Sequence, residues 1–125
     1  MGRRVSVPES VRSALEGVFG RDVRPVLVIE HSVFARMHWN ATATTRRRRI
    51  YLSGSARDFF ADPALMLHEY CHVVMQWEPG RLTTFRYLME WSRRGYWNNR
   101  FEVEARQFAT THLRRFQDLL TPSST

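Results

Sequence analysis

The chain has 125 residues, of which 43% are hydrophobic and 25% are charged, a composition that predicts a folded domain and excludes an intrinsically disordered protein. Its single cysteine, Cys71, excludes an intramolecular disulfide, and no apolar run approaches the ~18 residues that a membrane-spanning helix needs. All 19 basic residues are arginines, and they outnumber the 12 acidic residues to give a formal net charge of +7, so nucleic acid has to be considered as a partner.

The beginning of the chain lacks the apolar run of a secretory signal peptide. We therefore expect a cytoplasmic location by default, with export by a non-classical route left open. The absence of a long apolar segment also predicts no membrane partner. Nothing in the sequence indicates the oligomeric state.

The first third of the chain predicts one long helix and one strand. Ser6 and Glu9 have the spacing of a capping box, and Gly20 is a typical residue beyond a helix end, so we predict a helix between them. The apolar, β-branched run 26–29 predicts a buried strand, and residues 32–38 predict a short helix.

A hairpin is predicted next. Segments 41–45 and 50–52 have the composition of strands and flank a run of four arginines, Arg46, Arg47, Arg48 and Arg49. We expect these arginines at the hairpin turn, where they form a solvated tip or offer a contact for nucleic acid.

The second half of the chain predicts three helices. The first starts at Asp62 and ends near Glu78, the second covers 82–94, and the third starts at Asn98 or Asn99 and ends at Leu120. The predicted fold class is α+β, with a small, mostly antiparallel sheet in the N-terminal half packed on the first of these helices and on the two further C-terminal helices. We predict one domain over 1–120 and a disordered tail over 121–125.

The strongest chemical signal is the HExxH motif His68-Glu69-Tyr70-Cys71-His72, inside the first of those three helices. Residues four apart lie on one face of an α-helix, so the two imidazoles converge and can bind one metal ion. Glu69 projects beside them, where a carboxylate can take a proton from a water held by the metal. The alternative is a pair of partly buried histidines and a surface glutamate that bind no metal.

A catalytic zinc ion needs a third protein ligand. Glu102 and Glu104 are the best candidates, but they point about 200° apart on a helix, so only one of them can face the histidines. Glu102 lies nearer the predicted apolar face of its helix and is the preferred ligand, with Glu104, a further histidine or no protein group as alternatives. Glu102 also lies three residues after Asn99, which is the spacing of a capping box.

These residues carry a family resemblance. The HExxH motif followed by Glu102-x-Glu104-Ala105 resembles the small gluzincin-type metallopeptidases, zincins whose third zinc ligand is a glutamate. Segments 41–44, 50–54 and 65–69 resemble those of uncharacterised bacterial HExxH domains associated with contractile injection systems. Together the similar segments span about residues 26–110. In one departure, Arg106 stands where many gluzincins have an aspartate that supports the site.

The resemblance implies a zincin-like fold and a zinc-dependent metallopeptidase. It implies one Zn²⁺ per chain, bound by His68, His72 and Glu102. It further implies hydrolysis of a peptide bond by a zinc-bound water, with Glu69 as the general base.

Two details of that activity are expected from the residues around the motif. A further hydrogen-bond donor would stabilise the oxyanion, and Tyr96 is our candidate, with Tyr87 as the alternative. The substrate is expected to be a peptide or protein that adds as a strand to the edge of the sheet, which we place at 50–52.

Two other functions stay open at this point. The chain can be a catalytically inactive metal-binding domain of a secretion or phage-like assembly. It can also be a basic nucleic-acid-binding module that uses 82–94 and the following helix in the manner of a helix-turn-helix.

Overall fold

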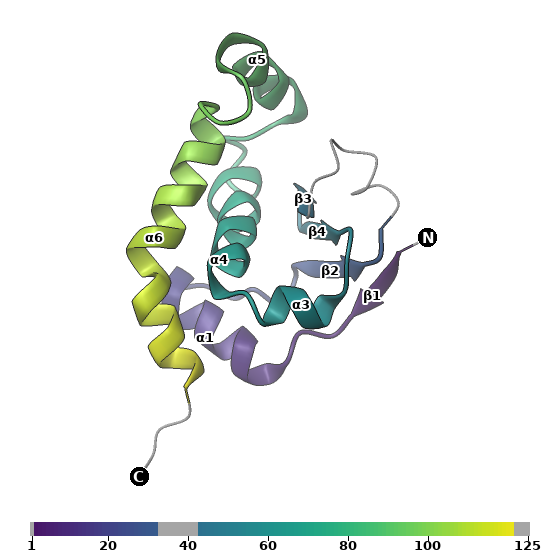
Figure 1. Ribbon diagram of the computed structural model, residues 1–125, viewed down its shortest axis with the longest axis vertical. Coiled ribbons are helices and arrows are strands. Elements are labelled where there is room, and N and C mark those ends of the chain that lie inside the picture. Colours follow the sequence, from purple (N-terminus) through teal and green to yellow (C-terminus); the bar gives the residue numbers. More distant parts are fainter. Residues whose placement is uncertain (1, 33–42, 122–125) are drawn as a thin grey trace.

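The computed structural model describes residues 2–32 and 43–121 (Figure 1). The elements follow in the order β1 (Arg3–Val5), α1 (Glu9–Phe19), β2 (Leu27–Glu30), β3 (Ala43–Arg46), β4 (Arg49–Leu52), α3 (Ala56–Phe60), α4 (Pro63–Cys71), the π-helix η1 (His72–Trp77), α5 (Thr84–Arg94) and α6 (Arg100–Leu120). The short helix predicted at 32–38, except for Ser32, and the tail beyond Thr121 lie outside the described residues. The expected α+β class is confirmed.

The four strands form one mixed sheet with the order β1-β2-β4-β3. β1 pairs with β2 and β3 pairs with β4 in antiparallel fashion, whereas β2 and β4 are parallel, with Val28 opposite Ile50. The expectation that 50–52 forms the sheet edge is therefore wrong. β4 lies inside the sheet, between β2 and β3. β3, which precedes β4 in the sequence, is the strand at that edge.

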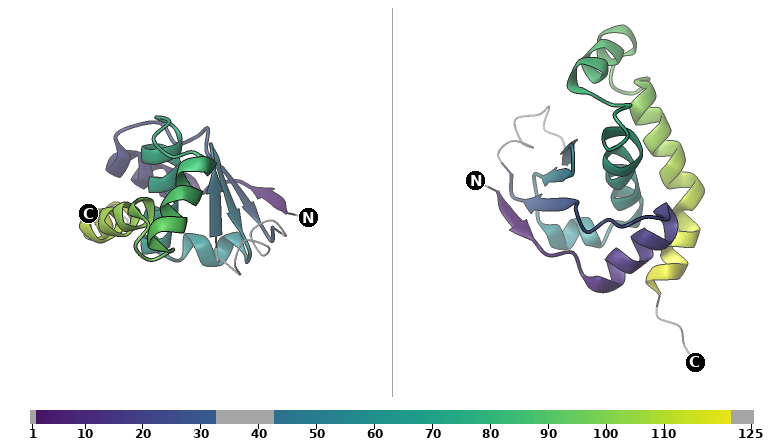
Figure 2. Two further views of the ribbon diagram at one scale, coloured as in Figure 1. Left: turned by 90° about the horizontal axis from the view of Figure 1, so that it is seen from above. Right: turned by 180° about the vertical axis from the view of Figure 1, so that it is seen from behind.

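The helices α1, α4 and α6 lie on one side of this sheet, and α4 lies between the sheet and α6 (Figures 1 and 2). Strand side chains alternate between faces, so Val28, Ile50 and Leu52 all turn toward the helices and are buried. Met66 and Leu67 of α4 join them in one hydrophobic cluster. This core holds α4, and with it the HExxH motif, firmly against the sheet.

The hairpin turn between β3 and β4 is formed by Arg47 and Arg48, as predicted for the arginine run. Arg48 has a φ of 61°, in the left-handed region that a tight two-residue turn requires. Its guanidinium also reaches the end of η1, where Nη2 lies 2.8 Å from Oε1 of Glu78. The turn is thus tied to the helix that follows the motif.

Helix ends follow the capping signals only in part. Asp62 caps α4 by accepting a hydrogen bond from the amide of Leu65 at 3.1 Å, and Gly20 ends α1 in the left-handed conformation, both as predicted. The capping box expected from Ser6 and Glu9 is absent, because α1 begins after Pro8 without a side-chain cap. The short elements β1 and α3 were not predicted, since three and five residues are too few to show a hydrophobic period.

The helix that carries the motif changes its hydrogen bonding at its centre. α4 ends at Cys71 and continues without a break as η1, a π-helix that begins at His72. π-Helical turns are rare in proteins and occur frequently at functional sites. Trp77, the last residue of η1, donates from Nε1 to Oγ1 of Thr45 at 3.2 Å, which joins this turn to the edge strand β3.

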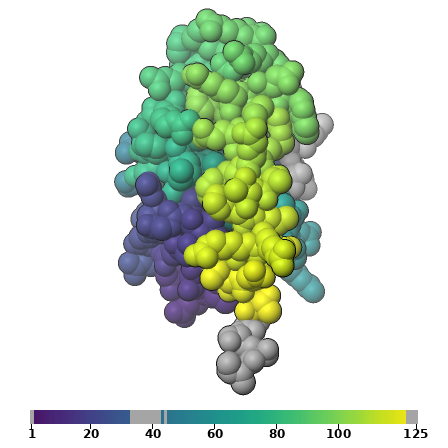
Figure 3. Space-filling view, turned by 90° about the vertical axis from the view of Figure 1, so that its left-hand side faces the viewer, coloured from purple at the N-terminus to yellow at the C-terminus, as the bar shows by residue number. Residues whose placement is uncertain are grey.

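The long helix α6 closes the other side of the core. It packs along α4 and α1 and runs along most of the face shown in Figure 3. Phe116 and Ala109 are buried beneath it, and a Cβ on Gly17 of α1 would lie only 3.0 Å from Cδ1 of Leu119, so a glycine allows the close approach of the two helices. No helix within the described ranges is long and apolar enough to cross a membrane.

Tyr70 gives a prediction about stability. Its side chain is fully buried, and its hydroxyl has no hydrogen-bond partner among the described residues. A buried hydroxyl without a partner is destabilising, so Tyr70→Phe should raise the free energy of unfolding by about 1 kcal/mol in urea titrations. Tyr87→Phe, which removes a hydroxyl bonded to Glu102, should not raise it. A loss of stability in Tyr70→Phe would contradict this account.

Candidate metal site

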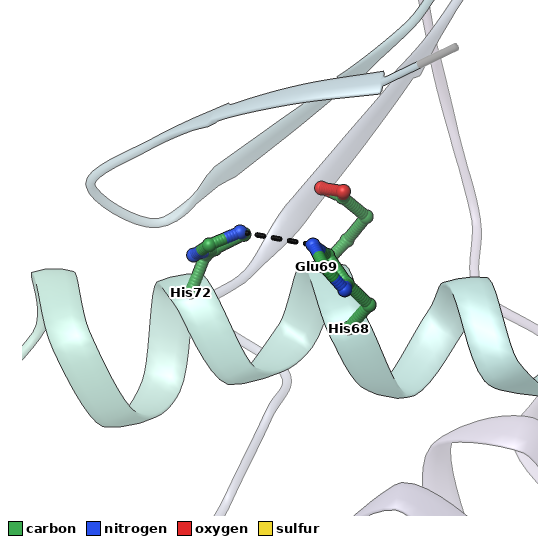
Figure 4. Close-up of side chains that lie close together, drawn as sticks. All are labelled: His68, Glu69 and His72. Carbon is green, nitrogen blue, oxygen red and sulfur yellow. Dashed lines mark hydrogen bonds between the residues drawn. The ribbon is translucent and has the colours of Figure 1, made fainter. Parts of the chain in front are cut away.

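His68 and His72 bring their imidazoles together on one side of the α4–η1 helix (Figure 4). The two Nε2 atoms lie 3.2 Å apart, and the rings meet edge to face. His72 is buried, and the side chain of His68 is only slightly exposed. The i, i+4 spacing therefore produces the expected convergence of the two rings, which persists although the π-helix starts at His72.

Glu102 completes the cluster from α6. Its Oε1 lies 2.9 Å from Nε2 of His68 and 3.1 Å from Nε2 of His72. The interpretation of Glu102 as part of a capping box is wrong, because its carboxylate is turned to the histidines while the Asn99 side chain caps α6 at the amide of Phe101. Asn99 still helps the site, since its cap fixes the first turn of the helix that presents Glu102.

The three donor atoms of His68, His72 and Glu102 form a triangle with sides of 2.9, 3.1 and 3.2 Å. In a tetrahedral zinc site with ligand distances of 2.0–2.1 Å, neighbouring donors are about 3.4 Å apart. The observed triangle is therefore close to one face of such a tetrahedron. A metal ion can be held here with little movement of the side chains.

Gln76 determines which nitrogen of His72 carries a proton. Its amide nitrogen donates to the carbonyl of Phe101 at 2.9 Å and to Oε1 of Glu104 at 3.0 Å, so its oxygen faces Nδ1 of His72 at 2.7 Å. An oxygen can only accept, and Nδ1 must therefore carry the hydrogen. In neutral His72 the lone pair is then on Nε2, the atom that faces Glu102 and His68, which is the arrangement that metal-bound histidines require.

Glu104 contacts the cluster only indirectly, through Gln76, which bonds His72. Its carboxylate accepts from Gln76 and forms an ion pair with Arg81, whose Nη2 lies 2.7 Å from Oε2. The sequence leaves open a hydrogen bond of Gln76 near the site, although Gln76 lies four residues after His72 and so on the same face of the helix. Arg81 had no predicted role, because its contact with Glu104 depends on how α6 packs on η1.

Glu69 lies beside the histidines without bonding to them. One donor atom from each of His68, Glu69 and His72 lies within 4.8 Å of the others, and together these residues can hold a metal ion (Figure 4). Burial raises the pKa of the Glu69 carboxyl, against the opposing effect of the two histidines. A carboxylate with a raised pKa is better able to accept a proton and release it again.

Two tyrosines approach Glu102 from the α5 side. The hydroxyl of Tyr87 donates to Oε2 of Glu102 at 3.0 Å and so holds the oxygen that does not face the histidines. Tyr96, our candidate for stabilising the oxyanion, is half-exposed, and burial together with the nearby carboxylates of Glu102 and Glu69 raises its pKa to about 12. Its hydroxyl therefore keeps its proton near neutral pH and can donate a hydrogen bond.

Glu102 and His72 shift each other's pKa values. Burial alone would lower the pKa of His72, but the hydrogen bond and charge of Glu102 raise it to about 9. Burial works to raise the pKa of Glu102, yet its hydrogen bonds with His68 and His72 keep that pKa well below the usual value. Glu102 is thus ionised, as a metal ligand must be.

The role of Gln76 leads to a prediction about metal affinity. Gln76→Leu keeps the volume of this fully buried side chain but removes the acceptor for Nδ1 of His72. We expect zinc affinity to fall by about 10–100-fold, the range for losing such a supporting contact. Competition titration with a chromophoric chelator measures it, with Gln107→Leu on the exposed side of α6 as the matched control. Equal affinities in the two variants would contradict the assignment.

Comparison with known proteins connects this site to a family. A family model described as the eCIS core domain, the core domain of extracellular contractile injection systems, matches residues 6–80. None of the curated proteins and none of the solved structures matches the chain. The matched segment includes His68, Glu69 and His72 and ends before Glu102. Because it covers more than half of the sequence, the chain belongs to the eCIS core domain family.

Proposed function

We propose that this protein is a zinc-dependent peptidase that works with a contractile injection system. The observation that carries the proposal is the triangle of donor atoms from His68, His72 and Glu102, with the carboxylate of Glu69 beside it. The family membership supports the link to an injection system. The gluzincin resemblance of the same residues supports the hydrolytic activity.

Zinc is the metal that this donor set favours. Two imidazole nitrogens and one carboxylate oxygen are the ligands of many catalytic zinc sites, and three protein ligands leave one position open. Calcium and magnesium prefer sites made wholly of oxygen ligands, which the two histidines exclude. Cys71 is buried on the same helix, and burial raises the pKa of its thiol to about 12.

A bound zinc ion supplies Lewis-acid chemistry, polarising the scissile carbonyl and making water more acidic. Glu69 takes a proton from the attacking water and delivers it to the departing amine nitrogen. One C–O bond forms, the C–N bond breaks, and one water is consumed for each peptide bond. Tyr96 donates a hydrogen bond to the carbonyl oxygen as negative charge develops on it.

The edge strand β3 is our proposed docking strand for the substrate. It is the last strand of the sheet, and the Trp77–Thr45 hydrogen bond fixes it beside η1. An extended peptide that pairs with its main chain is held next to the metal helix. The arginine run is less available for a contact with nucleic acid than its sequence indicated, because Arg48 is paired with Glu78 and Arg46 is partly buried.

The proposal is tested by incubating the zinc-loaded chain with a peptide library and identifying new termini by mass spectrometry. We expect new termini that disappear with 1,10-phenanthroline and return when zinc is restored. A set of cleavages that the chelator leaves unchanged would point to a contaminating protease. No cleavage by the zinc-loaded chain would favour the non-catalytic metal-binding alternative.

A further inference from the structure

The helix α5 exposes its apolar face to solvent and buries an acidic residue, which is the reverse of an ordinary surface helix. Its buried residue is an acid, Glu90, whereas Phe85, Leu88 and Met89 are 70%, 55% and 38% exposed. At about 100° per residue these three side chains share one face, and Glu90 and Tyr87 lie on the opposite one. An amphipathic helix that shows its apolar face to solvent is characteristic of a docking surface.

The exposed face lies at one end of the molecule. α5 forms the tip opposite the C-terminus, beyond the sheet and the upper end of α4 (Figures 1 and 3). Trp97, in the turn that follows α5, adds to the tip and is 67% exposed even though the guanidinium of Arg106 lies 3.8 Å from the centre of its ring. A tip of this kind can meet a flat surface without interference from the rest of the chain.

The charge around this face has one sign. Arg86 and Arg93 are exposed on α5, next to the apolar side chains. The only acidic residue of the helix, Glu90, is turned inward, where its carboxylate lies 3.2 Å from Nε of Arg94 and accepts from the amide of Arg100. The face therefore combines apolar side chains with positive charge that no exposed acid on α5 offsets.

Charge complementarity selects the partner. Pairing with a second copy through this face would bring two basic surfaces together, which is unfavourable. Phenylalanine, leucine and methionine on one face of a helix, beside arginines, form the pattern of helices that lie in the interface of an anionic bilayer. This mode needs no membrane-spanning segment, so it is compatible with the absence of one among the described helices.

We infer that α5 forms a peripheral docking surface for an anionic lipid bilayer. The apolar face (Phe85, Leu88 and Met89) enters the headgroup region, and Arg86 and Arg93 contact lipid phosphates. The opposite side of the same helix carries Tyr87, whose hydroxyl bonds Glu102. The metal site thus lies about one helix diameter, ~10 Å, behind the bound surface.

Vesicle flotation with the purified chain tests this inference independently of peptidase activity. We expect the chain to float with vesicles of phosphatidylcholine and phosphatidylglycerol, and much less with phosphatidylcholine alone or at high salt. Phe85→Ser combined with Leu88→Ser should abolish flotation, whereas Leu119→Ser, at an exposed leucine of α6, should leave it unchanged. Arg93→Glu should lower vesicle affinity at least about fivefold, and the matched change Arg114→Glu on α6 should have little effect.

Three results would overturn the inference. One is a lack of flotation with anionic vesicles by the folded wild type. Another is equal loss of flotation in Arg93→Glu and Arg114→Glu, which would indicate a diffuse effect of net charge. The third is a dimer in light scattering that Leu88→Ser converts to a monomer, which would assign the face to a second copy of the chain. Circular dichroism of each variant checks that the fold is retained.

Discussion

Glu69→Gln is expected to lower kcat/KM for peptide hydrolysis by about 10²–10⁴-fold while zinc binding stays at the wild-type level. Glutamine has the shape of glutamate but cannot take a proton from water. Glu69 is not part of the donor triangle formed by His68, His72 and Glu102, so its replacement leaves the ligands in place. Metal content and cleavage rate, measured on the same preparation, separate the two roles.

The control for this variant is Glu78→Gln, at the residue that follows η1 and pairs with Arg48 at the hairpin. It removes one carboxylate next to that helix without touching the donor triangle, and it should retain activity. Zinc loss in Glu69→Gln would mean that Glu69 is a ligand rather than the base. Full activity in Glu69→Gln would eliminate it from the chemistry.

Loss of Glu102 should have the largest effect on metal binding. We expect Glu102→Ala to weaken zinc binding by more than the ~100-fold that loss of a supporting contact can cause, because one of three protein ligands is removed. Glu102→Gln preserves the packing of this buried side chain and should also bind zinc poorly. Isothermal titration or chelator competition gives the affinities.

Two other variants on α6 are the controls for the loss of zinc affinity in Glu102→Ala. Glu104→Gln disturbs the partner of Gln76 and Arg81 and should reduce affinity by no more than Gln76→Leu does. Asp118→Asn, at an exposed position on the same helix, should have no effect. If Glu104→Gln weakened binding as strongly as Glu102→Ala, the assignment of the third ligand would be wrong.

The parts of the site that sequence reasoning predicted are those encoded by spacing along one helix. His68, Glu69 and His72 needed only the helical period, and the helical wheel already favoured Glu102 over Glu104 on the side of the apolar face. The wheel carries no information about partners on other elements. It therefore did not indicate that Tyr87 holds the second oxygen of Glu102, or that Phe101 and Glu104 orient the amide of Gln76.

The wrong predictions about the fold also concern properties that local sequence patterns do not encode. The strands at 26–29 and 50–52 were predicted from composition, but their place inside the sheet, with β1 and β3 at its edges, depends on strand order, a tertiary property. The capping box of Ser6 and Glu9 is absent because the helix starts at Glu9 with Pro8 at the N-cap position, so Ser6 lies too early to cap it. The apolar face of α5 follows the helical period as well as any core face does, and periodicity cannot tell whether such a face is buried or exposed.

The family match covers only part of the candidate site, and the structure shows the rest. The matched segment supplies both histidines and Glu69, and the structure adds Glu102 from the helix beyond it. Tyr87, Arg81 and Glu104 also lie beyond residue 80, so much of what positions the site lies outside the matched segment. The proposed metal site therefore depends on α6 packing against α4.

X-ray absorption at the zinc edge of the zinc-loaded chain identifies the atoms that bind the metal. Ligation by His68, His72 and Glu102 predicts one zinc per chain, with scattering from two imidazoles and from oxygen at about 2.0–2.2 Å. A sulfur shell near 2.3 Å would place Cys71 on the metal, and a single imidazole or less than one zinc per chain would contradict the proposed site.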